Sequence, residues 1–446
     1  MAILLWMGRR LYDRETALMA GAMMTTSLAF FHYTHSARAD MAYAFWSNVE
    51  LAALVHSWRI TEENGRATLA PVLMWSTFAL ATLTKGPQAP AMFLFGFALW
   101  AMMERISLRR ALRCIRPVMG IAIYLALAAP WWGLVHYRVG GDGILGTQLS
   151  GSLLRFEWTH GIPVDYAYRL PQLLIPWFVL LPALLRVDWR DSQNGRQSRL
   201  LGVVILVTIA LFSLGSQRRV FYLLPIVAPT LLLAAAGTRR ILSSPSAKGR
   251  FRRAIEWLGP GYWLLVMIAL VILLAAPRWI PSLPSGTTLR AAVLLGVLMG
   301  VGAMFLVVFR DRGSRGTASV FGLAAVFFAT FWALGTPVQA WSKGRSHSER
   351  LGRLASILTA EGEVHTWDVF PDPFVYYARV PVKELQSKEQ VLAALDCATD
   401  RQLILIAKTK ELSTLPADVR VQMIDQPLSD GVRDISLVRL TAGTVR

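Results

Sequence analysis

Long hydrophobic runs separated by short polar loops recur along the first three quarters of the chain. A helix that crosses a membrane needs about 20 mainly apolar residues, and most of the runs approach that length. The pattern predicts eleven spanning helices: Thr16–Phe31, Met41–Trp58, Ala67–Thr82, Ala89–Met103, Val118–His136, Leu170–Leu185, Leu200–Leu214, Val220–Ala236, Trp257–Ala276, Leu289–Phe309 and Ser319–Thr336. We therefore expect an all-α polytopic membrane bundle over residues 1–342.

From about Lys343 onward, charged and polar residues occur at the frequency of a soluble protein. Helical spacing and short β-branched runs alternate there. They predict helices at Ser348–Leu358 and Lys388–Leu395, and strands at Val364–Val369, Gln402–Ala407 and Arg433–Leu440. We expect residues 343–446 to form a small α/β domain.

The first residues do not form a complete span. Met1–Met7 is too short to cross a membrane, and its charges, Arg9 and Arg10, follow the apolar stretch instead of preceding it as in a signal peptide. We interpret this segment as the end of a helix whose beginning lies outside the chain.

The loops between the predicted spans alternate in charge. One set is rich in arginine and lysine, for example at 105–116, 186–199 and 239–253. The other set holds fewer: Arg38, Lys85, Arg138, Arg155, Arg169, Arg218, Arg219 and Arg278. Because basic residues accumulate in cytoplasmic loops, the rich set is predicted to be cytoplasmic. The poor set and the C-terminal domain then lie on the outer face.

Composition narrows the class of protein. A hydrophobic content of 54% and a mean hydropathy of +0.44 exclude an ordinary soluble enzyme. Lys and Arg number 46 against 28 Asp and Glu, but they interrupt apolar spans, so we expect no nucleic-acid partner. Cys114 and Cys397 are predicted on opposite sides of the membrane, and no His/Cys cluster has metal-ligand spacing. We therefore expect no metal site among these residues and no cofactor, and dependence on a divalent metal stays open.

Three charged residues fall in short outer loops. Lys85 occupies a tight turn, Thr84–Pro87, where a cation beside membrane helices is costly and therefore suggests function. Asp40 follows Arg38 and opens a span, so it is either a helix N-terminal carboxylate favoured by the helix dipole or a carboxylate that faces a site. Glu50 lies deeper in that span, where we expect a hydrogen-bonded structural role.

A second group of polar residues lies in the other outer loops. Arg218 and Arg219 break the charge bias, either as a stop-transfer pair or, with Tyr222, as ligands of a phosphate. Arg155 and His160 lie in the long outer loop. A histidine in such a loop is more often a hydrogen-bonded structural residue than a catalytic base. Cations and a carboxylate on one membrane face suggest a site for an anionic lipid head group.

Taken together, these residues resemble the successive motifs of the type-C glycosyltransferases, which use polyprenyl-phosphate sugars. The family is typified by the lipid A aminoarabinose transferase and, more distantly, the protein O-mannosyltransferases. The resemblance covers about residues 1–340 and rests on Arg38-Ala-Asp40-Met41, Leu83-Thr84-Lys85-Gly86-Pro87, Pro130-Trp131-Trp132, Arg155-Phe156 with His160 and Pro163, and Ser216–Pro225. The Lys-Gly-Pro turn and the Arg-Arg…Tyr-Leu-Leu-Pro segment are the most specific parts.

The resemblance implies a bacterial inner-membrane enzyme with a periplasmic C-terminal domain. It would transfer a sugar from a polyprenyl-phosphate donor to a lipid A-like glycolipid, another envelope glycan or a protein. The implied donor-phosphate ligands are Lys85, Arg218, Arg219, Tyr222 and Arg155. Asp40 would be the catalytic carboxylate or orient the acceptor or a phosphate-binding cation, with Arg38 and His160 on the acceptor side. No nucleotide-binding loop is present.

Two other functions stay open. A transporter or flippase for a polyprenyl-linked glycan would also need a polytopic bundle with cationic head-group contacts, although no inverted repeat is evident. The family pattern also begins with one more span and an outer loop carrying a principal catalytic acid, and neither is seen before Met1. A fragment that only binds the lipid is therefore the second alternative.

Overall fold

The computed structural model describes residues 1–34, 38–63, 65, 68–139, 165–190, 194–214, 219–244, 249–275, 287–308, 314–344, 347–358, 363–369, 372–398, 402–424 and 435–442. It divides into two units. Unit 1 comprises Met1–Pro281 and Thr288–Trp332, and unit 2 comprises Ser282–Thr287 and Ala333–Arg446. The boundary expected at residues 342 and 343 falls inside the helix that runs through this region, and it stays a prediction.

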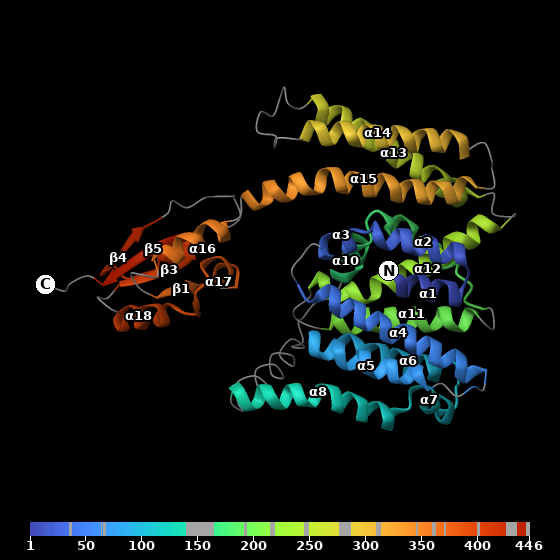
Figure 1. Cartoon of the computed structure of the whole chain (residues 1–446), viewed down its shortest axis with the longest axis horizontal. Helices are drawn as coiled ribbons and strands as arrows, with labels where there is room; N and C mark the ends of the chain where they lie inside the picture. The colour runs from blue at the N-terminus through green and yellow to red at the C-terminus, as the bar shows by residue number, and fades with distance from the viewer. Residues whose placement is uncertain are drawn as a thin grey trace. The chain divides into compact units, whose positions relative to one another are not determined.

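Unit 1 is helical throughout its described part (Figure 1). Its α-helices are α1 (Ala2–Leu11), α2 (Arg14–Thr25), α3 (Leu28–Thr34), α4 (Asp40–Glu62), α5 (Leu69–Thr84), α6 (Gln88–Met103), α7 (Leu108–Ile115), α8 (Pro117–Val139), α10 (Asp165–Leu173), α11 (Asn194–Ser213), α12 (Leu224–Ser243), α13 (Arg250–Ala275), α14 (Thr287–Val308) and α15 (Arg315–Gly344). Two 3₁₀ helices, η1 (Trp177–Arg186) and η2 (Val220–Leu223), complete it.

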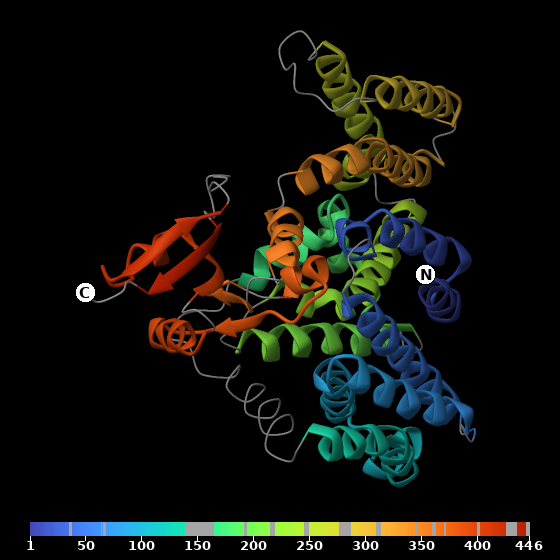
Figure 2. The same ribbon diagram turned by 60° about the vertical axis from the view of Figure 1, so that its left-hand side comes forward.

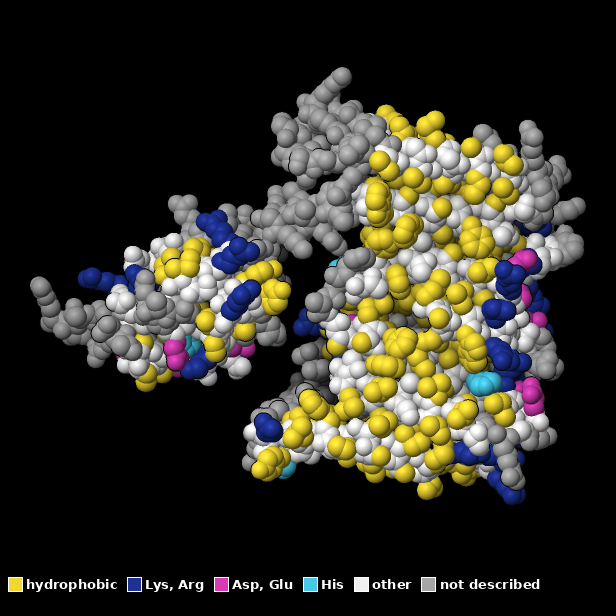
Figure 3. Space-filling model, viewed as in Figure 1, with side chains coloured by type: hydrophobic (Ala, Val, Ile, Leu, Met, Phe, Trp, Pro, Cys, Tyr) yellow, Lys and Arg dark blue, Asp and Glu magenta, His cyan; other side chains and the backbone are white. Residues whose placement is uncertain are grey.

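The chain is a multi-pass membrane protein. Within the described residues, five helical stretches are long and apolar enough to cross a membrane: Leu108–Arg138, Asn194–Ser213, Val220–Ser243, Arg250–Val271 and Arg315–Ala333. Shorter apolar helices lie at Leu69–Thr84, Gln88–Met103, Trp177–Arg186 and Val293–Phe305. Hydrophobic side chains cover the flank of unit 1, whereas Lys and Arg gather along the right-hand end of its helices (Figure 3). The apolar helices and this apolar surface together confirm the expected all-α polytopic membrane bundle.

The gathered charges form ion pairs between helix ends. Glu62 and Glu104, where α4 and α6 end, both pair with Arg196 at the start of α11, at 2.9 and 3.6 Å. Arg240 of α12 pairs with Asp188 at 2.8 Å. A helix of 23 residues is about 35 Å long, so these pairs lie at the opposite end of α4 from Asp40.

Two predicted spans are interrupted in the structure. The span expected at Thr16–Phe31 is split into α2 and α3, because the hydroxyl groups of Thr26 and Ser27 donate to Ala22 and Met24 carbonyls and the chain turns there. The span expected at Leu170–Leu185 is instead the end of α10, a turn and η1. Prolines lack the N–H that an α-helix needs and recur along this stretch, at positions 171, 176 and 182.

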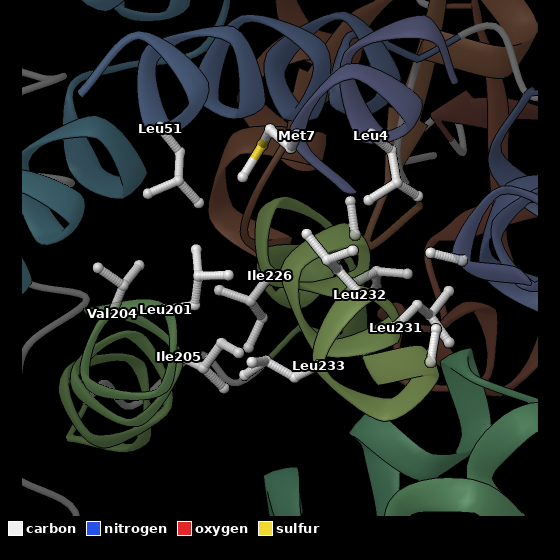
Figure 4. Close-up of a cluster of buried hydrophobic side chains, with 14 of the residues drawn as sticks. Leu4, Met7, Leu51, Leu201, Val204, Ile205, Ile226, Leu231, Leu232 and Leu233 are labelled. Atoms are coloured by element: carbon white, nitrogen blue, oxygen red, sulfur yellow. The ribbon is translucent and has the colours of Figure 1, made fainter. Parts of the chain in front are cut away.

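The core of unit 1 is apolar and continuous. Figure 4 shows Leu51 of α4 and Met7 of α1 facing Leu201 of α11 and Leu232 of α12, and each of them is at most 2% exposed. Close helix contacts depend on small residues: a Cβ on Gly237 of α12 would lie 2.0 Å from a carbonyl oxygen of η1. Packing of this kind holds the helix ends of the bundle in place.

Helices α13, α14 and α15 form a group of their own (Figures 1 and 2). The Ser319 hydroxyl of α15 accepts from the Gly259 amide of α13 and donates to the Ile255 carbonyl, both at 2.7 Å. Trp263 of α13 donates to the Leu298 carbonyl of α14 at 2.7 Å.

Unit 2 contains a five-stranded mixed sheet in the order β2-β1-β3-β5-β4. Figure 1 labels β1, β3, β4 and β5 of this sheet. The strands are β1 (Val364–Trp367), β2 (Lys383–Leu385), β3 (Gln402–Lys408), β4 (Val419–Met423) and β5 (Ile435–Ala442). Strands β1, β2 and β3 are parallel, and β5 is antiparallel to β3 and β4. Its helices are α16 (His347–Leu358), α17 (Asp372–Ala378), α18 (Lys388–Cys397) and α19 (Thr409–Leu412).

The strand alternation sends side chains of β3 to two apolar layers. Leu403 and Leu405 pack with Val391 of α18, whereas Ile404 and Ile406 pack in the cluster that contains Leu351 of α16. This arrangement confirms the expected small α/β domain. The sequence analysis missed β2 and β4. Strand β2 has only three residues, and β4 alternates apolar and polar residues but keeps most of its side chains exposed.

Candidate functional site

Helix ends at one end of unit 1 bring the candidate residues together. Asp40 is the first residue of α4, and Lys85 follows the last residue of α5. Since α4 and α5 are antiparallel neighbours, the start of one lies beside the end of the other (Figure 1). The Lys85 turn continues through Gly86, whose φ of +134° favours glycine.

Asp40 is a buried carboxylate held by two cations. It is 3% exposed. Arg38 Nε donates to its Oδ2 atom at 2.7 Å, and Lys85 Nζ donates to its Oδ1 atom. An unpaired carboxylate at this depth would be costly, so both cations stabilise its charged form. Asp40 also lies in the first turn of α4, where the helix dipole favours a negative charge, so the two interpretations of this residue do not exclude each other.

An aromatic wall from η2 covers both cations. The centroid of the Phe221 ring lies 4.2 Å from Arg38 Cζ and 4.2 Å from Lys85 Nζ. The Tyr222 centroid lies 5.4 Å from Lys85 Nζ, and this ring stacks on Phe212 of α11 at 5.3 Å. Such contacts attract a cation to the ring face and limit its rotamers. They fix where the two positive charges lie.

Polar contacts outside the cluster hold its helices in register. The Tyr43 hydroxyl accepts from the Ala89 amide of α6 at 2.7 Å, while its ring lies 5.8 Å from Lys85 Nζ. The Asn48 amide donates to the Pro225 carbonyl of α12 at 3.0 Å, next to η2. These bonds join α4 to the elements that supply Lys85 and Phe221.

The cluster carries a net positive charge, because one carboxylate faces two cations. Lys85 and Arg38 keep part of their surface open, with side-chain exposures of 25% and 48%. A guanidinium has five N–H donors and an ammonium three, so each group can donate to more than one acceptor. The arrangement can therefore bind an anion such as a phosphate at the membrane edge, with Asp40 orienting both donors.

The other predicted site residues are placed less completely. Arg219 is exposed and directly precedes η2, and its carbonyl accepts from the Tyr166 hydroxyl at 3.4 Å. Its guanidinium makes no ion pair in the described part of the chain. Arg155, His160 and Arg218 lie outside the described residues.

Sequence reasoning missed Phe221 and Tyr43. Phe221 stood inside the Arg-Arg…Tyr-Leu-Leu-Pro motif, but an aromatic residue at a span end has many structural explanations.

For Glu50 the expected hydrogen bonds are absent: it is 0% exposed, and neither carboxylate oxygen has a partner among the described residues. No group of three His, Cys, Asp or Glu within those residues could hold a metal ion.

Comparison with known proteins gives sequence and fold similarity to one group of enzymes, although no family model matches. An undecaprenyl phosphate-alpha-4-amino-4-deoxy-L-arabinose arabinosyl transferase of Pectobacterium carotovorum subsp. carotovorum (strain PC1) is 27% identical over 279 residues, which are 61% of this chain and 48% of the relative. A relative of the same name in Aeromonas salmonicida (strain A449) is 26% identical over 283 residues, 62% of this chain and 50% of that protein. The chain spans about half the length of the curated relatives it matches.

Among solved structures, ArnT from Cupriavidus metallidurans bound to undecaprenyl phosphate has the same fold. The match has a TM-score of 0.66 at 15% identity and covers 98% of this chain and 81% of that one. The expected resemblance to the type-C glycosyltransferases is confirmed. The similarity in fold extends over both the helical bundle and the small C-terminal sheet domain.

Proposed function

We propose that the chain acts as a type-C glycosyltransferase. It transfers a sugar from a polyprenyl-phosphate donor to a lipid A-like glycolipid or another envelope glycan. The reaction takes place on the periplasmic face of the bacterial inner membrane, where unit 2 also lies. The names of the curated relatives support transfer, and they give no support to the transport function or the protein acceptor that the sequence left open.

The observation that carries the proposal is the buried Asp40 carboxylate between Lys85 and Arg38, against the Phe221 ring. A polyprenyl-phosphate donor keeps its phosphate at the membrane edge while its tail lies among the lipids. Two fixed cations at that edge match the charge and depth of such a phosphate. The fold similarity to a protein bound to undecaprenyl phosphate supports this ligand class.

The cations also suit the chemistry of the step. When the bond between sugar C1 and the phosphate oxygen breaks, negative charge grows on the departing phosphate. Cations fixed in advance stabilise that charge more in the transition state than in the ground state. Lys85 is the principal ligand in this proposal, with Arg219, Tyr222, Arg218 and Arg155 as further donor-phosphate ligands.

In this proposal Asp40 orients the two cations. It keeps Lys85 and Arg38 in one arrangement, so that their positions need not be reorganised during the reaction. Arg38, the more exposed of the two cations, and His160 are assigned to the acceptor side. No step in this scheme requires a metal or other cofactor.

A titration with undecaprenyl phosphate tests the donor site. The full chain in nanodiscs is titrated as wild type, Lys85→Ala and Lys85→Arg. A lost charged hydrogen bond costs about 1.5–3 kcal/mol, so Lys85→Ala should weaken binding at least about tenfold and abolish transfer. Lys85→Arg should recover little, because the planar guanidinium does not reproduce a point charge in this turn.

The matched control is Arg138→Ala. Arg138 is an exposed cation in the last turn of α8, at the same end of the bundle but outside the cluster. It should leave both affinity and transfer unchanged. Equal affinity of Lys85→Ala and wild type would remove Lys85 from the donor site.

A further inference from the structure

A second cationic site lies at the opposite end of unit 1 from Asp40. A cavity of about 330 Å³ is lined by the end of η1, the last turns of α12 and the start of α13. Three arginines, Arg186, Arg240 and Arg252, form its charged wall, and Ile241 and Phe251 are the apolar residues of its lining. The candidate glycosyltransferase site uses none of these residues.

The arginines keep hydrogen-bond donors available. Arg240 pairs with Asp188 through Nη1 at 2.8 Å, and Arg252 pairs with Glu256 through Nε at 3.0 Å. Each of these contacts uses one nitrogen of a group that has five N–H donors. Arg186 is exposed and has no ion pair or hydrogen bond in the described part of the chain. Three guanidinium groups therefore face one cavity beside two carboxylates, which leaves a net positive charge.

The surroundings of the cavity belong to the membrane edge. Leu185, next to Arg186, is 82% exposed, and Trp257 of α13 is 66% exposed. Farther along α13, Leu264 and Ile268 are also exposed. Tryptophan is enriched at membrane interfaces, and exposed aliphatic side chains on a spanning helix contact lipid tails. A ligand whose charged group binds in this cavity can therefore place an apolar group against the neighbouring protein surface.

We propose that this cavity binds the phosphate head group of an anionic phospholipid, in the leaflet opposite the Asp40 site. Arginine is suited to phosphate because its planar fork can give two parallel hydrogen bonds. Basic pockets between spanning helices are typical binding sites for anionic lipid head groups. The exposed apolar surface of α13 favours a lipid over free phosphate, since it can contact the acyl chains.

Lipid binding to the purified full chain tests the proposal. The chain in nanodiscs of phosphatidylcholine is titrated with a short-chain phosphatidylglycerol, and binding is followed by native mass spectrometry. Arg186→Gln should weaken binding about tenfold, because a charged hydrogen bond is lost. Arg186 makes no contact that folding needs, so this variant should keep the wild-type melting temperature.

The control variant is Arg113→Gln, an exposed arginine of α7 at the same end of the bundle. It removes the same charge but lies outside the cavity, so phosphatidylglycerol should bind it as tightly as wild type. Equal weakening by both variants would mean a diffuse charge effect and would overturn the site.

A second arm separates lipid from free anion. Inorganic phosphate at millimolar concentration should not displace phosphatidylglycerol, since it has no tail to contact α13. Displacement by inorganic phosphate, or unchanged phosphatidylglycerol affinity of Arg186→Gln, would overturn the lipid proposal.

Discussion

At the scale of single residues, charge pairing decides what each ionisable group can do. Asp40 is nearly fully buried but has a cation on each carboxylate oxygen. Glu50, in the same helix, has no partner among the described residues. The sequence presented both as acids of one span. Only the tertiary structure shows that Asp40 orients two cations, whereas Glu50 is buried among the described residues without a partner.

Asp40→Asn should separate transfer from binding. The amide keeps the size of the side chain but removes its charge, so Lys85 and Arg38 lose their shared anchor. The net positive charge of the cluster rises by one, and affinity for undecaprenyl phosphate should therefore fall no more than a few-fold. The transfer rate should fall at least tenfold, because the cations are no longer held in place.

A titration and a single-turnover transfer assay on the same preparation measure both effects. Glu62→Gln is the control for the helix itself, since Glu62 lies at the opposite end of α4 from the cluster and pairs with Arg196 of α11. Transfer by Asp40→Asn at the wild-type rate would contradict the proposed role of this carboxylate.

In unit 2, His365 makes stability depend on pH. It is 6% exposed in β1, its Nδ1 atom has no hydrogen-bond partner within the described residues, and burial lowers its pKa. In the unfolded chain the pKa is about 6.5. Below that pH the unfolded chain takes up a proton that the folded unit does not, so the free energy of unfolding falls as pH falls from about 7 toward 5.5.

His365→Phe should flatten this dependence. Melting temperatures of the full chain at pH 7.5 and 5.5 should differ less in the variant than in wild type. The carboxylates of Glu363 and Asp368 do not interfere, because hydrogen bonds from Lys383 and Lys408 lower their pKa values, which moves their titration farther from this pH range. An equal pH dependence in the variant would assign the effect to other groups.

At the scale of elements, close helix contacts decide which helices can be neighbours. Trp75 of α5 donates from its ring nitrogen to the Ile115 carbonyl at 2.7 Å, just before α8 begins. A Cβ on Gly120 of α8 would lie 2.0 Å from the same ring. Gly120 therefore lets α8 approach α5, and α5 in turn places Lys85. Hydropathy located both helices but carried no information on this contact.

Two glycine variants of α8 test that contact. Gly120→Ala should destabilise the bundle by about 2 kcal/mol or more, because the Trp75 ring must move out of a packed position. Gly133→Ala, in the same helix, has nothing within 4 Å of its Cβ and should be neutral or stabilising by up to about 1 kcal/mol. Thermal unfolding in the same detergent compares them, and equal melting temperatures would contradict the close approach.

At the scale of the whole molecule, the two ends of unit 1 have different chemistry. Ion pairs such as Glu62–Arg196 and Asp188–Arg240 occupy one end, and the Asp40 cluster occupies the other. The loops predicted to be cytoplasmic coincide with the first end. The orientation in the membrane follows from the positive-inside rule and remains a prediction.

Reporter fusions test this orientation. A reporter active only in the periplasm should be silent when fused after Ser244, at the end of α12, and active when fused after Arg446. A cytoplasmic reporter at the same positions is the matched control and should give the inverse pattern. The opposite result would place the Asp40 cluster in the cytoplasm and remove the proposed periplasmic reaction.

The sequence by itself determined where most spans lie, which loops are basic and where the composition changes to that of a soluble α/β domain. These features are local, because hydrophobicity and charge act residue by residue along the chain. Their positions in short outer loops gave Lys85, Asp40 and Arg38 as candidates before any contact was visible, and resemblance to known motifs supported the choice. Neither could show that Asp40, at a helix N-terminus, also forms two ion pairs.

Only the tertiary structure decided the contacts. It placed Phe221 over both cations, broke two predicted spans at Thr26 and at the prolines around η1, and gathered three arginines around a cavity at the other end of unit 1. Each of these depends on how helices distant in sequence approach one another, which small residues and side-chain volumes decide. The periodicity of a sequence shows which face of a helix is apolar. Only the packed structure shows which residues that face contacts.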